Sequence, residues 1–323
     1  MNKYLNTLLT AAVIALMSGC SSDSITDDEP EEQPFDNRIK IETSIDGMTR
    51  TAFDADGNQV FSRSDNAFFC YFTPGSEFNS TTAEIQLYSY FDGWTPRRDP
   101  LVWPDNVTPL NFVGLHNVAN VQPDGKSYNT IIPDKQENFD YIAKNDVLVA
   151  YSGNVKPGTT VHLQFKHVLA KLQVNVRLSD EVKAAGKTAA DIKGAVAHAY
   201  AYGIIDNSKI AEGIIKVTPN DAYQMENMVL RTKVAAKEGY DASYVSIMLP
   251  IKDMLKKIGV GVGADMYTFN SDNFIELLQN HCTQVNITVY EEGLKIDGIT
   301  ISPWIMNTPV DIVGGDIVEQ TTL

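Results

Sequence analysis

The chain contains 323 residues, with 26 Lys or Arg and 41 Asp or Glu, so its formal charge is -15 at pH 7. At about 150 residues per domain, this length predicts two domains, each large enough to bury its own core. A protein that neutralises a polyanion needs a basic patch, and the acidic composition therefore argues against nucleic acid as a partner.

The first 20 residues have the order of a secretory signal that ends at a cysteine. Lys3 precedes Leu8–Met17, an almost unbroken apolar run. This run is about half of the ~20 residues that a helix needs to cross a bilayer, so it fits a signal peptide over residues 1–19. Leu16-Met17-Ser18-Gly19-Cys20 resembles a bacterial lipobox, although Met17 stands where leucine is more common. We expect Cys20 to be acylated and to anchor the protein to a membrane; the alternative is an ordinary thiol beside a plain cleavage site.

An acidic segment over residues 20–36 follows the signal. Ser21–Asp36 contains seven acidic residues, no basic residue and two prolines. Such a composition buries too little apolar surface to offset the entropy of ordering, which predicts a disordered tether. The segment is either a simple spacer or an export address, because it resembles the signal that moves Bacteroidetes lipoproteins to the outer face of the outer membrane.

The rest of the chain has the short alternating runs of an all-β protein, punctuated by Gly, Pro, Asn and Asp. Ile39, Ile41 and Ile45 share one face of Arg38–Ile45, which predicts a half-buried strand. In Thr159–Leu178 the apolar residues hold odd positions as far as Phe165 and even positions from Val168. This change of phase predicts a β-bulge or a sharp bend near residues 166–168.

A further strand is expected at Val285–Val289, followed by a turn at Glu291–Gly293. Helical signals are limited to Ser179–Ile192, Pro250–Ile258 and Ser271–His281, the last with Ser271 as a candidate N-cap. The elements predict an all-β fold with minor helices. They fit two β-sandwich domains over residues 37–178 and 179–323, divided where the strand pattern gives way to Ala-rich sequence.

The sequence offers no recognisable catalytic or metal-binding motif. His162 and His167 are five positions apart on a predicted strand, so they point to opposite faces and cannot share a metal. Gly259–Ala264 matches a loose dinucleotide-binding pattern, but the preceding residues look helical, so a flexible loop is expected instead. Cys70 and Cys282 are expected to be free buried thiols. We therefore predict no cofactor, no metal and no enzymatic activity.

Several segments together resemble the fimbrillin or Mfa-like family, the type V pilins and related surface lipoproteins of Bacteroidales. The similar segments are Ile39–Ile41, Met48–Phe53, Leu101–Asn106, Leu110–Phe112, Asp146–Ala150, Phe165–Leu172, Val285–Val289 and Ile299–Trp304. Phe61-Ser62-Arg63-Ser64-Asp65 stands where the family usually has Trp-Ser-x-x-Asp. The resemblance implies two tandem transthyretin-like β-sandwich domains and a structural role as a fimbrial subunit that supports adhesion.

The resemblance also implies an assembly mechanism. In these pilins an arginine-specific protease cuts after the first strand, the strand leaves, and a strand from another subunit fills its groove. Arg50 matches the cleavage position, and the displaced strand would carry Ile39, Ile41 and Ile45. The alternatives are that Arg50 is an exposed hairpin arginine without a processing role, or that Arg38 is cut, which would remove only the tether.

The segment after Trp304 is the expected donor strand. It carries Val310, Ile312, Val313, Ile317 and Val318, although Gly314-Gly315 interrupts them, so a native edge strand is the alternative. The expected partners are other fimbrial subunits, the arginine-specific protease and a membrane that holds the lipid anchor. The expected location is the cell surface, either lipid-anchored in the outer membrane or within a fimbrium.

A second hypothesis is a monomeric surface lipoprotein that binds a glycan or a host ligand. Trp94 and Tyr88–Tyr90, beside Thr95–Arg98, would then form its aromatic platform. A buried core is the commoner place for such residues. An enzyme is the least favoured hypothesis, because no carboxylate pair or histidine stands in a catalytic context.

Overall fold

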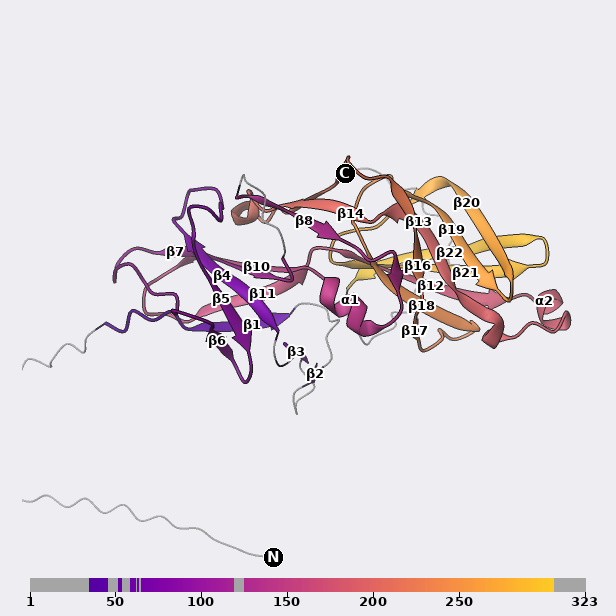
Figure 1. The fold of residues 1–323 in the computed structure, drawn as a ribbon, viewed down its shortest axis with the longest axis horizontal. Helices are drawn as coiled ribbons and strands as arrows, with labels where there is room; N and C mark the ends of the chain where they lie inside the picture. The colour runs from indigo at the N-terminus through magenta and orange to yellow at the C-terminus, as the bar shows by residue number, and fades with distance from the viewer. Residues whose placement is uncertain are drawn as a thin grey trace, which may run out of the picture. The chain divides into compact units, whose positions relative to one another are not determined.

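The computed structural model describes residues 35–45, 52–53, 59–61, 63, 65–118 and 125–304. The described residues from Asp36 to Trp304 belong to one compact unit. Strands hold most of its described residues, and the helices among them are short (Figure 1). The predicted all-β fold class with minor helices is thereby confirmed.

A seven-stranded sheet contains most strands of the N-terminal half. In spatial order its strands are β1 (Ile41–Ile45), β11 (Val161–His167), β10 (Leu148–Val155), β7 (Leu110–His116), β4 (Asn66–Phe72), β5 (Glu84–Tyr90) and β6 (Trp94–Pro96). The first and last strands of this order meet, because Nε1 of Trp94 on β6 donates a 2.9 Å hydrogen bond to Oγ1 of Thr43 on β1. The sheet therefore curls around the aromatic side chains of its inner face.

A three-stranded sheet covers the outer face of the seven-stranded sheet. It contains β15 (Lys216–Pro219), β14 (Tyr202–Asp206) and β8 (Ser127–Ile131). Tyr128 and Ile205 from this sheet pack with Cys70, Val113 and Leu115 in one buried cluster. A two-stranded hairpin, β2 (Ala52–Phe53) with β3 (Gln59–Val60), lies between β1 and β4 in the sequence.

Two five-stranded sheets enclose the core of the C-terminal half. One contains β17 (Thr232–Val234), β18 (Ala242–Met248), β12 (Ala170–Leu178), β21 (His281–Tyr290) and β22 (Gly293–Pro303). The other contains β20 (Asp265–Ile275), β19 (Leu255–Val262), β13 (Ile192–Tyr200), β16 (Met225–Leu230) and β9 (Lys135–Gln136). The N-terminal half holds two buried clusters, one on each face of the seven-stranded sheet, and the C-terminal half holds one. This arrangement is consistent with two tandem β-sandwiches.

Four short helices complete the described elements: α1 (Phe139–Asn145), α2 (Asp180–Ala184), and two 3-10 turns at Ala189–Asp191 and Ile210–Glu212. Oγ of Ser179 accepts a 3.4 Å hydrogen bond from the Val182 amide and so caps α2. The predicted helix over Ser179–Ile192 is confirmed in part: α2 forms its first turn, and the 3-10 turn at Ala189–Asp191 lies near its end. The two are separate because Gly186 adopts a left-handed φ of 86°, which continues no helix.

The change of apolar phase in residues 159–178 marks the place where the chain leaves one sheet for another. β11 ends at His167 in the seven-stranded sheet, and β12 begins at Ala170 between β18 and β21. The two residues between them, Val168 and Leu169, form a bend, so the predicted bend is confirmed. β12 thus pairs with C-terminal strands, although the predicted division after Leu178 grouped it with the N-terminal ones; that division into domains stays a prediction.

The other two predicted helices are wrong. Pro250–Ile258 enters β19 at Leu255, and Ser271–His281 contains the end of β20 and the start of β21. The expected loop at Gly259–Ala264 is also wrong, because β19 continues through Val262. Ile258, Val260 and Val262 alternate into the C-terminal core. The pairing of β19 with β13 on one side and β20 on the other overrides the local glycine content.

Gly114 on β7 tests how tightly the inner face of the curled sheet is packed. A Cβ at this position would lie 2.5 Å from Cζ of Phe165, whose side chain is fully buried. We expect Gly114→Ala to lower the free energy of unfolding in urea by about 1–3 kcal/mol, because overpacking forces the ring out of place. Gly293→Ala is the matched control, since no atom lies within 4 Å of its Cβ position. Equal stability of the two variants would contradict the prediction.

Candidate functional site

Strand β1 corresponds to the segment predicted to be displaced, and it lies at the edge of the seven-stranded sheet. It pairs in parallel with β11, from Ile41 opposite Val161 to Ile45 opposite Phe165. Just before β1, the Ile39 amide donates to the Leu101 carbonyl at 3.1 Å, and the Trp103 amide donates to the Asn37 carbonyl at 2.7 Å. Within the described part of the chain, the backbone of residues 37–45 is held by the pairing with β11 and by these two hydrogen bonds to residues 101 and 103.

The isoleucines of this segment face inward, as the alternation predicts. Ile39 is 7% exposed and belongs to the core of the seven-stranded sheet, while Ile41 and Ile45 are half-buried and pack against that core. Lys40, Glu42 and Ser44 point to solvent. The strand therefore covers the core on one side only, which is typical of a half-buried edge strand.

An aromatic cluster lies beside β1 in that core. Phe165 packs against Phe61 with ring centroids 5.2 Å apart, and Phe61 packs against Trp94 at 4.8 Å, both edge to face. Phe69 contacts Trp94 at 5.0 Å in the same way. The hydrogen bond from Trp94 to Thr43 joins the cluster directly to β1. Removal of β1 would therefore uncover aromatic side chains as well as the backbone edge of β11.

The same residues form core and not an exposed aromatic platform. Tyr88 is 4% exposed, and its hydroxyl accepts a 2.8 Å hydrogen bond from the Leu101 amide. Tyr90 and Trp94 are half-buried and pack edge to face with each other. Trp94 also packs edge to face with Phe61, whereas the Tyr90 ring is tilted by 49° to that of Phe61. The sequence did not predict the backbone hydrogen bonds that residues 101–103 form with the segment before β1. The apolar residues Leu101 and Trp103 are the one feature of the sequence that indicates a buried segment there.

A second notable group lies at the crossover between the sheets. Nδ1 of His167 and Oδ2 of Asp146 are 2.8 Å apart, and neither side chain is exposed. The His167 ring stacks on the indole of Trp304, with centroids 3.9 Å apart and planes 10° apart. The group thus joins the end of α1, the bend after β11 and the last described residue of the chain. Trp304 is 1% exposed.

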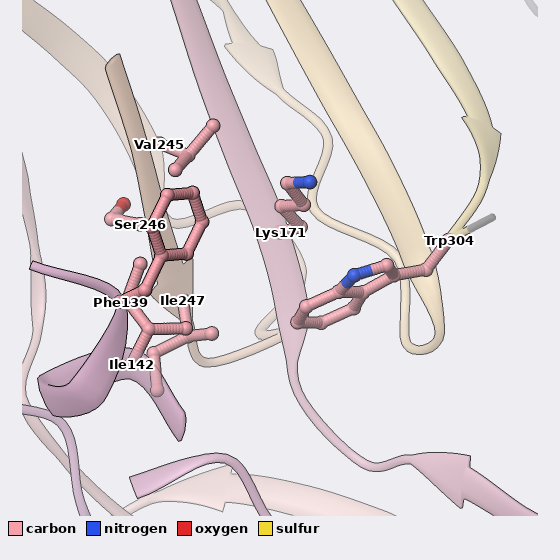
Figure 2. A pocket seen from close by; sticks show the side chains of 7 residues that line it. All are labelled: Phe139, Ile142, Lys171, Val245, Ser246, Ile247 and Trp304. Atoms are coloured by element: carbon pink, nitrogen blue, oxygen red, sulfur yellow. The ribbon is translucent and has the colours of Figure 1, made fainter. Parts of the chain in front are cut away.

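A small cavity lies next to this group, between α1, β12 and β18. Figure 2 shows Lys171 and Trp304 on one side of it, with Ser246, Ile247 and the α1 residues Phe139 and Ile142 opposite. Burial lowers the pKa of the Lys171 ammonium, while Cys282 and Asp146 act in the opposite direction. The cavity measures only about 10 Å³, which suits at most one water molecule. It is too small to be a substrate or cofactor site.

The thiols of Cys70 and Cys282 are buried and form no disulfide, as expected. Burial raises the pKa of both thiols, so at neutral pH they stay protonated and unreactive. We expect neither to be alkylated in the native protein at pH 7 and both to react in denaturant, measured by peptide mass mapping. Since an unfolded thiol ionises near pKa about 8.5, stability should fall as the pH rises above that value. Rapid native alkylation of Cys70 would contradict this.

The described residues hold no group of three or more His, Cys, Asp or Glu arranged to bind a metal. No helix in the described ranges is long and apolar enough to cross a membrane. Of the predicted site residues, Ile39, Ile41 and Ile45 lie together at the sheet edge. Cys20, Arg50 and the expected donor segment after Trp304 lie outside the described residues.

Comparison with known proteins agrees with this architecture. A model of the fimbrillin-like family matches residues 39–304. The chain is similar to a proposed cell adhesion protein from Bacteroides uniformis, with a TM-score of 0.59 and 14% identity, over 84% of this chain and 100% of the other. It is also similar to a proposed cell adhesion protein from Bacteroides ovatus, with a TM-score of 0.58 and 16% identity, over 84% and 99%. These identities support the fold alone, and no curated protein matches the chain.

Proposed function

The chain belongs to the fimbrillin-like family, and we propose that it is a structural fimbrial subunit assembled by proteolysis-triggered donor-strand exchange. The family indicates a fimbrial, cell-surface and non-enzymatic role. The subunit would be exported as an outer-membrane lipoprotein through Cys20 and the acidic tether. Its partners would be other fimbrial subunits, an arginine-specific protease and the membrane that holds the lipid anchor.

The edge position of β1 is the observation that carries this proposal. Its backbone pairs with a single strand, β11, over five residues. Edge strands are the places where another chain adds a strand, because the ladder on the far side remains open. Once β1 leaves, the edge of β11 and the inward side chains beside it become a groove of the right length for a replacement strand.

The energetics favour replacement over an empty groove. Full burial of one isoleucine is worth about 1.5–3 kcal/mol, so buried Ile39 with half-buried Ile41 and Ile45 contributes about 3–6 kcal/mol. Three fully buried isoleucines would contribute more, but Ile41 and Ile45 are only half-buried. The contribution is still a large share of the about 5–15 kcal/mol that stabilises a typical protein. A subunit without β1 would therefore be aggregation-prone unless a donor strand filled the groove.

The donor would be the segment after Trp304, with Val310, Ile312, Val313, Ile317 and Val318. Trp304 is anchored in the buried group with His167, so the segment would start from a fixed point. A donor strand needs alternating apolar residues to enter a half-buried groove. Gly314-Gly315 would then separate two short apolar stretches.

Digestion with an arginine-specific protease tests the proposal. We expect cleavage after Arg50, release of the fragment that contains Ile39–Ile45, and polymer ladders on a denaturing gel. Arg50→Lys should block both release and polymerisation, while Arg38→Lys should leave both unchanged. If residues 39–50 stay attached to the protein and no polymers form, the exchange mechanism fails. Deletion of residues 305–323 separates the donor from the acceptor: such a chain should be cut but should not polymerise with itself.

A further inference from the structure

A hollow of about 260 Å³ lies on the outer face of the sheet that contains β20, β19, β13 and β16. Its lining residues alternate with those that enter the core. Ala197 and Ala199 on β13 face the core, whereas Val196 and His198 line the hollow. The volume is close to the lower limit of small-molecule sites, about 300 Å³.

A glycine creates the depth of the hollow. Gly259 on β19 lies opposite Val196 on β13 and opposite Thr268 on β20, so these residues form one row across the strands. Val229 on β16 continues the row, opposite Val196. Met266, which is 57% exposed, overhangs it, since a Cβ on Gly259 would lie 3.2 Å from the Met266 sulfur. This row offers a shallow and largely apolar floor.

The next row across the same strands is polar. His198 lies opposite Asn227, and their Nδ1 and Oδ1 atoms are 3.3 Å apart. Lys257 on β19 extends this row and is exposed. A ligand in the hollow would thus have apolar contacts along one side, and an amide, an imidazole and an ammonium group along the other.

The charge of the hollow is opposite to that of the protein. No Asp or Glu is among its lining residues, although the chain carries a formal charge of -15. Lys257 is the one Lys or Arg among the lining residues. A negatively charged ligand group would therefore be attracted to Lys257, and a carboxylate could also accept hydrogen bonds from the neighbouring donors.

The backbone N–H and C=O groups of the central strands under the hollow already pair with neighbouring strands. β13 pairs with both β16 and β19, and β19 pairs with both β13 and β20. An extended peptide laid across these strands could not add to the ladder, so only side chains can recognise the ligand. A compact ring with one apolar C–H face and hydroxyl and carboxylate groups matches the two rows better than a peptide does.

We propose that this hollow binds a carboxylate-bearing sugar residue of an acidic glycan. The sugar ring would lie over Gly259 and Val196 beneath Met266, and its carboxylate would face Lys257. Asn227, His198 and Thr268 would bond its hydroxyl groups. The site lies on a sheet whose strands β13, β16, β19 and β20 are remote in sequence from β1, and it does not depend on polymerisation. It would give the subunit an adhesive surface of its own.

Calorimetric titration of the full chain at low salt tests the site, with glucuronate as the probe. Glucose is the neutral control of the same ring, and a triglutamate peptide is the acidic control. We expect glucuronate to bind about tenfold more tightly than glucose, a difference of about 1.4 kcal/mol. Lys257→Gln should remove this preference. Gly259→Val should weaken glucuronate binding by about tenfold or more, because its side chain fills the hollow.

Lys256→Gln is the matched control, because it removes the same charge from the next residue of β19. Lys256 lies over the Phe274 ring, with Nζ 4.2 Å from the centroid, and does not line the hollow. It should bind glucuronate within twofold of the parent protein, and thermal unfolding should confirm that all variants fold. Equal affinity for glucose and glucuronate, no detectable glucuronate binding, or an equal loss in both lysine variants overturns the proposal. Tighter binding of triglutamate that depends on Lys257 overturns it in favour of an acidic peptide.

Discussion

The Phe165→Ala variant should unfold in urea with a free energy about 3–5 kcal/mol lower than that of the parent protein. Phe165 is fully buried on β11 and packs edge to face with Phe61 and Phe69. Removal of its ring leaves a cavity that the neighbouring aromatic rings cannot fill without leaving their own contacts. Because Phe165 also pairs with Ile45, the last residue of β1, the loss should extend to the edge strand.

The functional consequence is measurable in the same variant. Phe165→Ala should speed the release of the β1 segment by protease, because the groove holds the strand less well. Phe274→Ala is the control: Phe274 is 42% exposed and its ring contacts Lys256, so we expect a loss of no more than about 1 kcal/mol. A loss below about 1 kcal/mol for Phe165→Ala would mean that the inner face of the curled sheet is not a packed core.

The Asp146→Ala variant should lose about 3–5 kcal/mol of stability, as expected when one member of a fully buried polar pair is removed. Oδ2 of Asp146 lies 2.8 Å from Nδ1 of His167, and neither side chain is exposed. The substitution leaves the imidazole in the interior without this acceptor. Since His167 also stacks on Trp304, the end of β22 should loosen, and proteolysis after residue 304 should become faster.

An exposed ion pair supplies the comparison for Asp146→Ala. Lys209 and Glu212 lie 3.8 Å apart, with side chains 55% and 59% exposed, so Glu212→Ala should change stability by less than about 1 kcal/mol. Asp146→Asn should lie between the parent and Asp146→Ala, because the amide oxygen can still accept from His167. Equal stability of Asp146→Ala and Glu212→Ala would show that the buried pair contributes no more than a surface pair.

Phe165→Ala and Asp146→Ala each affect one of the two places that the proposed strand exchange involves. Phe165 lies under the strand that would leave, and Trp304, held by His167, lies where the proposed donor segment begins. β11 carries Phe165 and ends at His167, so a single strand contacts both places. If β1 is released as proposed, the neighbouring strand must stay fixed, and the two buried groups on β11 would provide that support.

The local pattern of the sequence was sufficient where one face of a strand is buried. The alternation of Ile39, Ile41 and Ile45 predicted an inward-facing strand, and the change of phase before Val168 predicted the bend between β11 and β12. In both cases the side chains that enter a core repeat every second residue, so the period is readable without knowing the partner strands.

The local sequence pattern gave wrong secondary structure where pairing with other strands decides it. Pro250–Ile258 and Ser271–His281 contain charged and straight-chain residues that suit a helix, yet β19 and β20 pair with each other along most of their length. Gly259 and Gly261 weaken a strand when considered alone. They are tolerated in β19 because strands on both sides supply the ladder, and Gly259 forms the floor of the hollow as a result.

The sequence alone determined the all-β class, the inward face of the first strand and the resemblance that led to the fimbrillin-like family, since each depends on short-range periodicity or local motifs. Only the tertiary structure decided that β1 is an edge strand parallel to β11, that Trp94 joins it to β6, and that Asp146, His167 and Trp304 meet. The residues that meet in these features are between 21 and 158 positions apart in the sequence. Whether they meet depends on the order of the strands in the sheets. Strand order is set by the packing of whole sheets, which no local segment encodes.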